Sequence, residues 1–137
     1  MSDSGQCLCG AVTFEAEGVE RHFHSCHCGA CRRWSGSPAM AARVSSVLFN
    51  DDAPVRTFAS SEWAERGFCG ECGSNLFYRM RDTGDTMMWI GTFNDQGAFH
   101  MSGEIYVDAK PDSYAFAGDH PRMTEAEFLA SIGMADS

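Results

Sequence analysis

The chain has 137 residues, which suits one domain of ordinary size, and 44% of them are hydrophobic, enough to bury a core. A formal charge of −9 at pH 7 argues against general binding to nucleic acid or anionic membranes. No apolar run approaches the roughly 20 residues of a membrane span, and the segment Met1 to Gly5 lacks the basic and then apolar layout of a secretory signal. We expect a single domain over residues 1–137, located in the cytoplasm, with neither nucleic acid nor a membrane as partner.

Alternation of apolar and polar residues predicts a series of short β-strands. Val12, Phe14 and Ala16 share one face of a strand over residues 11–17, with threonine and glutamate on the other face. Similar patterns predict further strands at residues 22–27, 39–44, 55–60, 64–68, 76–80, 87–93 and 105–107. Glycine, aspartate and asparagine pairs mark the turns between them.

One helix is predicted near the C-terminal end. Thr124 and Glu127 have the spacing of a capping box, Phe128 and Ile132 follow as apolar positions, and Gly133 is a stop signal. The sequence therefore predicts a mainly β single domain with a short C-terminal helix.

Seven cysteines are the most informative feature of the sequence. Their number is odd, and they fall into three groups: Cys7 with Cys9; Cys26, Cys28 and Cys31; and Cys69 with Cys72. In a reducing compartment such grouping indicates metal or redox chemistry rather than disulfides. Zinc is the usual metal for clustered thiolates, and an iron–sulfur cluster is the competing assignment.

The local spacings explain how these sulfurs could share an ion. In a C-x-C segment on an extended strand, residues i and i+2 point to one face. In a C-x-x-C segment, glycines such as Gly29, Gly70 and Gly73 allow a tight knuckle whose backbone amides donate to the thiolates. We therefore expect zinc knuckles between the strands.

The number of cysteines divides into one closed and one open site. A structural zinc takes four protein ligands, whereas a catalytic zinc keeps three and leaves one position free. Cys26, Cys28 and Cys31 are compact enough to act as one three-sulfur unit. The remaining four, Cys7, Cys9, Cys69 and Cys72, would then form a closed site that joins the N-terminal region to the middle of the chain.

Two other arrangements are possible from the sequence alone. A zinc ribbon could pair Cys28 and Cys31 with Cys69 and Cys72, but the intervening segment is far longer than the usual roughly 15–20 residues. Disulfides would leave one thiol over and would require strained bridges within C-x-C. We prefer two metal sites, one of them open.

Charge is distributed unevenly around the cysteines. The segment from Arg21 to Phe49 has no aspartate or glutamate, but it has four arginines, including Arg32 and Arg33 beside the middle cysteines. These guanidinium groups could offset the nearby thiolates or bind the carboxylates of an anionic substrate, and both roles are compatible.

Four segments carry a resemblance to a known family. Gly5–Val12, Cys26–Arg33, Phe68–Leu76 and Ile105–Tyr114 resemble, in order, spacing and flanking residues, the glutathione-dependent formaldehyde-activating (Gfa) family, whose domain is shared with centromere protein V. The resemblance covers about residues 5–115.

The resemblance implies a β-tent-like fold with two Zn²⁺ ions per chain. By motif position, Cys7, Cys9, Cys69 and Cys72 would hold the structural ion, and Cys26, Cys28 and Cys31 the catalytic one. It also implies a carbon–sulfur lyase reaction that interconverts S-(hydroxymethyl)glutathione with formaldehyde and glutathione.

A three-thiolate zinc suits a thiol substrate. Its formal charge of about −1 makes it a weaker Lewis acid than a three-histidine zinc, and it favours soft ligands. We expect the thiol of glutathione, or of a similar small adduct, to take the open position and ionise there, so that it can add to or leave a carbonyl carbon.

The remaining polar and aromatic candidates have weaker signals. Arg32 and Arg33 are the candidates for binding substrate carboxylates. His27 lies between two cysteines and is assigned to substrate binding rather than to the metal, with general acid–base work and a structural role as its alternatives. His24 is a candidate for a position beside the metal ligands. Trp34, Trp63 and Trp89 could line a pocket or the core, and His100 and His120 carry no readable signal. The alternative to an enzyme is a zinc-binding scaffold or protein-interaction module.

Overall fold

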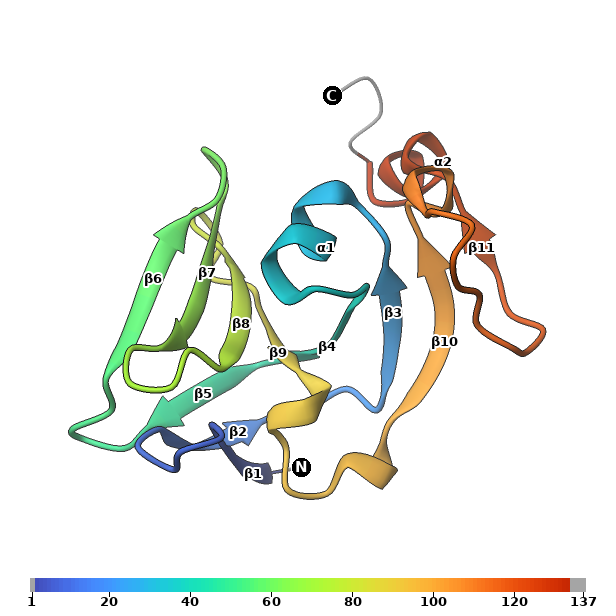
Figure 1. Cartoon of the computed structure of the whole chain (residues 1–137). Helices are drawn as coiled ribbons and strands as arrows, with labels where there is room; N and C mark the ends of the chain where they lie inside the picture. The colour runs from blue at the N-terminus through green and yellow to red at the C-terminus, as the bar shows by residue number, and fades with distance from the viewer. Residues whose placement is uncertain (1, 134–137) are drawn as a thin grey trace. The chain divides into compact units, whose positions relative to one another are not determined.

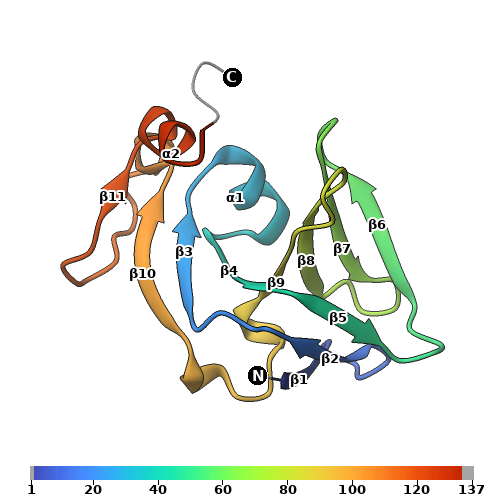
Figure 2. The same cartoon turned by 180° about the vertical axis from the view of Figure 1, so that it is seen from behind.

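The computed structural model describes residues 2–133, which fall into two compact units (Figures 1 and 2). The first unit comprises residues 2–22 and 41–100, and the second comprises residues 23–40 and 101–133. The predicted mainly β fold with a short C-terminal helix is confirmed.

Two antiparallel ladders build the first unit. The smaller has the order β1–β2–β5, formed by β1 (Ser2–Gln6), β2 (Thr13–Glu17) and β5 (Ser46–Phe49). The larger has the order β4–β9–β8–β7–β6. Its strands are β4 (Ala39–Val44, paired from Ala41 onward), β6 (Val55–Ala59), β7 (Ala64–Cys69), β8 (Asn75–Met80) and β9 (Thr86–Trp89). Two 3-10 turns, η1 (Ile90–Thr92) and η2 (Gln96–Ala98), follow β9.

Aromatic rings pack the core of the first unit. Phe14 on β2 meets Phe93 and Phe49 edge to face, at centroid distances of 5.5 and 6.1 Å. Phe49 also lies 5.9 Å from Phe77 of β8, so the rings join the two ladders. The alternation predicted for β2 is confirmed, because Phe14 and Ala16 are buried while their neighbours are exposed.

In the second unit, β10 (His100–Ile105) lies between β3 (His22–Cys26) and the two-residue β11 (Arg122–Met123), as Figure 1 shows. The unit also contains α1 (Gly29–Ser35), the 3-10 turn η3 (Val107–Ala109) and α2 (Glu125–Ser131). The capping box of α2 is present as predicted. The Glu127 amide donates to Thr124 Oγ1 at 3.2 Å, and the Thr124 amide donates to Glu127 Oε1 at 2.8 Å.

Some predicted boundaries are wrong. The apolar run at 87–93 is a strand only as far as Trp89 and is followed by η1. Of the strand expected at 105–107, only Ile105 belongs to a strand, as the last residue of β10, and η3 begins at Val107. β1, β5, α1 and most of β10 were not predicted, because their residues lack a clear apolar period. In residues 2–133 no helix is long and apolar enough to cross a membrane.

Gly67 shows how tightly the larger ladder packs against the Phe77 ring. A β-bulge interrupts the β7–β8 register at Gly67 and Phe68, and a Cβ atom at position 67 would lie 2.2 Å from the Phe77 ring. The absence of a side chain at this position lets the ring lie against the strand.

We predict that Gly67→Ala lowers the free energy of unfolding by about 1–3 kcal/mol, because the ring must move out of its packed position. Urea unfolding of the metal-loaded chain measures the change. Gly91→Ala is the matched control, since nothing lies within 4 Å of its added Cβ. Equal stability of the two variants would contradict the packing argument.

Candidate metal centres

The first cysteine pair lies in a turn rather than on the extended strand that we expected. β1 ends at Gln6, and the Cys7 amide donates to the Val12 carbonyl at 3.0 Å while the Gly10 amide donates to Cys7 at 3.3 Å. Gly10 has a φ of 82°, a left-handed conformation that glycine adopts without strain. The turn brings the Cys7 and Cys9 sulfurs within 3.6 Å of each other.

The pair at the end of β7 forms the predicted knuckle. The Gly73 amide donates to the Cys69 carbonyl at 2.8 Å, and Gly73 has a φ of 81°. The amides of Glu71 and Cys72 point at Cys69 Sγ, at 3.4 and 3.5 Å. Backbone dipoles therefore favour a thiolate at Cys69.

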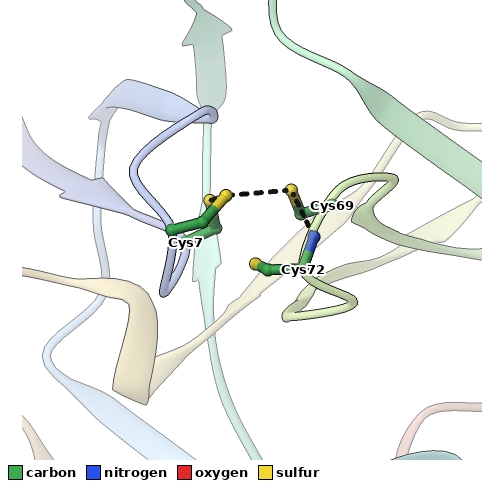
Figure 3. Close-up of side chains that lie close together, drawn as sticks. Cys7, Cys69 and Cys72 are labelled. Atoms are coloured by element: carbon green, nitrogen blue, oxygen red, sulfur yellow. Dashed lines mark hydrogen bonds between the residues drawn. The ribbon is translucent and has the colours of Figure 1, made fainter.

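These two turns meet and form one four-sulfur cluster. Figure 3 shows Cys7, Cys69 and Cys72 pointing toward one another from the two turns. Cys9 Sγ lies 3.9 Å from Cys69 Sγ, and all four sulfurs lie within 4.8 Å of one another. Ser74 connects the turns, since its Oγ accepts the Leu8 amide at 2.9 Å and lies 3.2 Å from Cys72 Sγ.

The thiols of the four-sulfur cluster have opposite pKa shifts. Hydrogen bonds from Ser74 lower the pKa of Cys72 to about 5. At Cys9 the Ala11 amide lowers the pKa, but loss of solvent and the three neighbouring thiols outweigh it and raise the pKa to about 12. Thiolates this close repel one another, so a cation is needed before all four ionise.

The geometry of the four-sulfur cluster fits zinc. Four sulfurs at a Zn–S distance of 2.3 Å in a tetrahedron lie about 3.8 Å apart. The separations of 3.6 Å between Cys7 and Cys9 and 3.9 Å between Cys9 and Cys69 bracket that value. The four-sulfur cluster therefore has the donor type, number and spacing of a closed zinc site.

The middle cysteines form a second cluster in the other unit. Cys26 is the last residue of β3, and Cys28 is the N-cap of α1, whose Cys31 amide donates to Cys28 Sγ at 3.4 Å. The expected knuckle is therefore the first turn of a helix. Capping rules did not reveal this helix, because the capping group is a thiol instead of a hydroxyl, carboxylate or amide.

This three-sulfur cluster has no fourth candidate ligand within the described residues. The sulfurs of Cys26, Cys28 and Cys31 lie within 4.8 Å of one another, and no histidine, aspartate or glutamate of residues 2–133 belongs to the group. Hydrogen bonds with the Cys28 and Cys31 thiols, together with burial, raise the pKa of Cys26. Three soft donors with one position left over fit the open type of zinc site.

His27 lies inside a buried hydrogen-bond network. Its side chain is 0% exposed, and its two ring nitrogens lie 2.8 Å from the Tyr114 hydroxyl and 2.7 Å from Glu104 Oε1. His120 and Arg122 occupy the other oxygen of Glu104, at 2.6 and 2.9 Å. Both nitrogens of His27 therefore have partners inside the protein, and its assignment to substrate binding remains a prediction.

Glu104 is held as a carboxylate by these neighbours. Burial alone would raise its pKa, but the hydrogen bonds from His120 and His27 and the charge of Arg122 outweigh burial and lower the pKa. Sequence reasoning did not single out Glu104, His120 or Arg122. The only indication in the sequence was a charged residue, Glu104, directly before the apolar residue Ile105 of a predicted strand.

The two candidate arginines differ in what they contact. Arg32 donates from Nε to the His27 carbonyl at 2.9 Å and from Nη2 to the Ala109 carbonyl at 3.1 Å. Arg33 is exposed, and within residues 2–133 its guanidinium has no hydrogen-bond or ion-pair partner. His24 is also exposed on β3, and Trp63 is 55% exposed whereas Trp34 and Trp89 are half-buried.

The two clusters predict distinct effects of single cysteine substitutions. The unmodified chain should bind about two zinc ions, and Cys28→Ser should bind about one while keeping its fold. Cys72→Ser should lose the metal that joins the two turns and fail to fold stably, because that site closes a long loop. Elemental analysis and circular dichroism measure both. A single ion shared by Cys28, Cys31, Cys69 and Cys72 would contradict the assignment.

Comparisons with known proteins bear on the family to which the chain belongs. The family model described as glutathione-dependent formaldehyde-activating enzyme matches residues 2–109. A Schizosaccharomyces pombe protein named an uncharacterized lyase is 35% identical over 133 residues, which cover 93% of this chain and 95% of that protein. The crystal structure of a Rhodobacter sphaeroides protein has the same fold, with a TM-score of 0.55 and 21% identity over 87% of this chain and 98% of the other.

The matched segment contains all seven cysteines, and the identity to the fission yeast protein extends over nearly the whole length of both chains. This chain therefore belongs to the glutathione-dependent formaldehyde-activating enzyme family.

Proposed function

We propose that this chain is a zinc-dependent carbon–sulfur lyase acting on a small thiol–aldehyde adduct such as S-(hydroxymethyl)glutathione. The family and the lyase-named relative support a glutathione-related lyase. One observation supports the assignment of sites: seven cysteines form one cluster of four and one cluster of three. In this proposal the cluster of four is structural, and Cys26, Cys28 and Cys31 form the reactive centre.

The donor set of the three-sulfur cluster suits a thiol better than a water molecule. Zn²⁺ held by Cys26, Cys28 and Cys31 would supply an open position at which a substrate thiol is stabilised as a thiolate. Three thiolate donors are electron-rich, so hydroxide formation is disfavoured and a soft sulfur ligand is favoured. The Cys31 amide, which donates to Cys28 Sγ, helps to keep that sulfur ionised.

The proposed reaction is a simple elimination from the adduct RS–CH₂–OH. The carbon–sulfur bond breaks and its electron pair leaves with sulfur as RS⁻. The hydroxyl oxygen gives its proton to solvent water, and the electron pair of the O–H bond forms the second carbon–oxygen bond of formaldehyde. The reverse direction is addition of the thiolate to the carbonyl carbon. The chain must therefore hold the sulfur, orient the adduct and accept a peptide that carries two carboxylates.

Arg33 is the better placed of the two arginines to bind such a carboxylate. Arg32 is held by two backbone carbonyls, which fix its guanidinium in the structure. Arg33 is exposed and has its donors available within the described residues. It also lies in the acid-free segment, where no nearby carboxylate of the same segment competes for it.

We also propose that both compact units belong to one domain, since the family match includes residues of each. A cytoplasmic location would keep all seven cysteines reduced, as metal binding requires.

Cobalt substitution tests the thiol-binding proposal. Adding glutathione to the cobalt-loaded chain should intensify the sulfur-to-cobalt absorption, because a fourth sulfur joins the three-sulfur cluster. S-methylglutathione, which has the same carboxylates and no ionisable thiol, is the matched control and should leave that absorption unchanged. An unchanged spectrum with glutathione would show that the thiol does not bind at the metal.

Arg33→Ala should raise KM for the glutathione adduct about 5–10-fold with little change in kcat, as expected for loss of a charged hydrogen bond at an exposed position. Arg43→Ala is the control, because Arg43 is exposed in the same acid-free segment but pairs with Asp85 at 2.9 Å. Steady-state kinetics with both variants measure the effect, and equal KM values would remove Arg33 from the proposed site.

A further inference from the structure

His27 separates two cysteines of the three-sulfur cluster and is held at all four of its polar groups. Its amide donates to the Ile105 carbonyl at 3.1 Å, and its carbonyl accepts from Arg32 Nε at 2.9 Å. Its ring nitrogens contact Glu104 and Tyr114. The four partners come from β10, from α1 and from the segment after η3. The backbone at position 27 is therefore fixed from several directions.

Glu104 fixes the direction of hydrogen bonding through the His27 ring. An ionised carboxylate can only accept, so His27 donates its Nε2–H to Oε1, and Nδ1 of a neutral ring then accepts the Tyr114 hydroxyl. Glu104 is 1% exposed and receives two further donors, His120 and Arg122, at Oε2. The carboxylate of β10 thus ties the residue that follows β3 to His120 and Arg122.

The position of His27 determines where Cys26 lies relative to the other two sulfurs. Cys28 and Cys31 are fixed to each other within the first turn of α1. Cys26 belongs to β3, and only the His27 peptide connects it to Cys28. Since successive Cα atoms are about 3.8 Å apart, a shift of His27 moves both flanking cysteines.

The four-sulfur cluster has no comparable support. Among the described residues, the hydrogen bonds to its sulfurs involve backbone amides, Ser74 and its own thiols. Four ligands around one ion define a tetrahedron by themselves, whereas three ligands leave the geometry less determined. An open site therefore depends more on the surrounding protein for its shape.

We propose that Glu104 is a positioning residue that acts through His27 to hold Cys26 in place beside Cys28 and Cys31, and so sets the metal affinity of the open site. The role rests on the proposed function of the three-sulfur cluster. It assigns no proton transfer to Glu104 or His27 and no direct contact with the substrate.

Metal titration of the 137-residue chain tests this role. The unmodified protein is titrated with Co²⁺ alone in competition with EDTA, and Cys31→Ser identifies the bands of the four-sulfur cluster. Glu104→Gln should leave binding of the first equivalent of Co²⁺ unchanged and weaken binding of the second by roughly 10-fold. This is the low end of the range for removing a group that contacts a metal ligand, since Glu104 acts through His27. The remaining d–d bands of the variant should shift, because one sulfur is displaced.

Glu65→Gln is the matched control, since Glu65 is a partly buried carboxylate paired with Arg79 at 3.3 Å in the first unit. It should change neither equivalent. General destabilisation of the chain would weaken both equivalents and would count against a specific role of Glu104. Unchanged affinity and unchanged bands for the second equivalent in Glu104→Gln would overturn the proposal.

Tyr114→Phe decides the question if Glu104→Gln does not fold. It removes only the hydroxyl that contacts His27 Nδ1. Its affinity for the second equivalent of Co²⁺ should fall by a smaller factor than in Glu104→Gln, with a smaller shift of the d–d bands. An identical second equivalent in this variant would overturn the proposal. A failure of the proposed lyase function can be told apart from a failure of the Glu104 proposal. In the first case the unmodified protein itself binds a single ion, or its cobalt spectrum does not respond to glutathione.

Discussion

The mutual repulsion of close thiolates is the constraint on which both candidate metal centres depend. Sulfur atoms 3.6–3.9 Å apart cannot all carry a negative charge unless a cation lies among them. In the four-sulfur cluster that requirement acts across turns that are 60 residues apart in the sequence. Binding an ion there connects β1 and β2 to β7 and β8, so metal binding and folding of the first unit are thermodynamically coupled.

The protein meets the requirement differently in the two clusters. In the four-sulfur cluster the polypeptide supplies two turns, each with a left-handed glycine, and a bound ion would complete the geometry. In the three-sulfur cluster the proposed function requires one position to stay available, so an ion there would not define the arrangement alone. The helix cap at Cys28 fixes two sulfurs, and the buried bonds around His27 fix the segment that carries the third. A closed site can be built from loops, whereas an open one benefits from rigid elements.

The division of the cysteines could be predicted because ligand spacing is a local property. Glycines and sulfurs within a few residues of each other show where a turn can form, and counting ligands then separates four from three. The alternation that predicts β2 is equally local. The capping box of α2 was readable for the same reason, since Thr124 and Glu127 are three residues apart.

Other features depend on contacts between residues that are far apart in the sequence. Glu104 becomes important only because His27, His120 and Arg122 converge on it from distant parts of the sequence. α1 was missed because a thiol replaces the usual capping group, and the extended C-x-C was wrong because backbone bonds to Val12 close a turn at Cys7. The sequence also did not show which of Arg32 and Arg33 is available for a substrate. Only the structure shows that Arg32 is bound to two carbonyls.

Net charge now constrains how a substrate would approach. The value of −9 counts every thiol as neutral, and ionising seven thiols adds more negative charge than two divalent cations remove. An anionic peptide is therefore repelled by the protein as a whole, and the acid-free segment 21–49 adds no carboxylate to that repulsion. The guanidinium of Arg32 is held by neutral carbonyls, so its positive charge is not cancelled by a carboxylate at those contacts. Arg32 can therefore have a structural role and still attract a substrate. The two carbonyls hold its guanidinium in place, and its positive charge can act on an incoming anion.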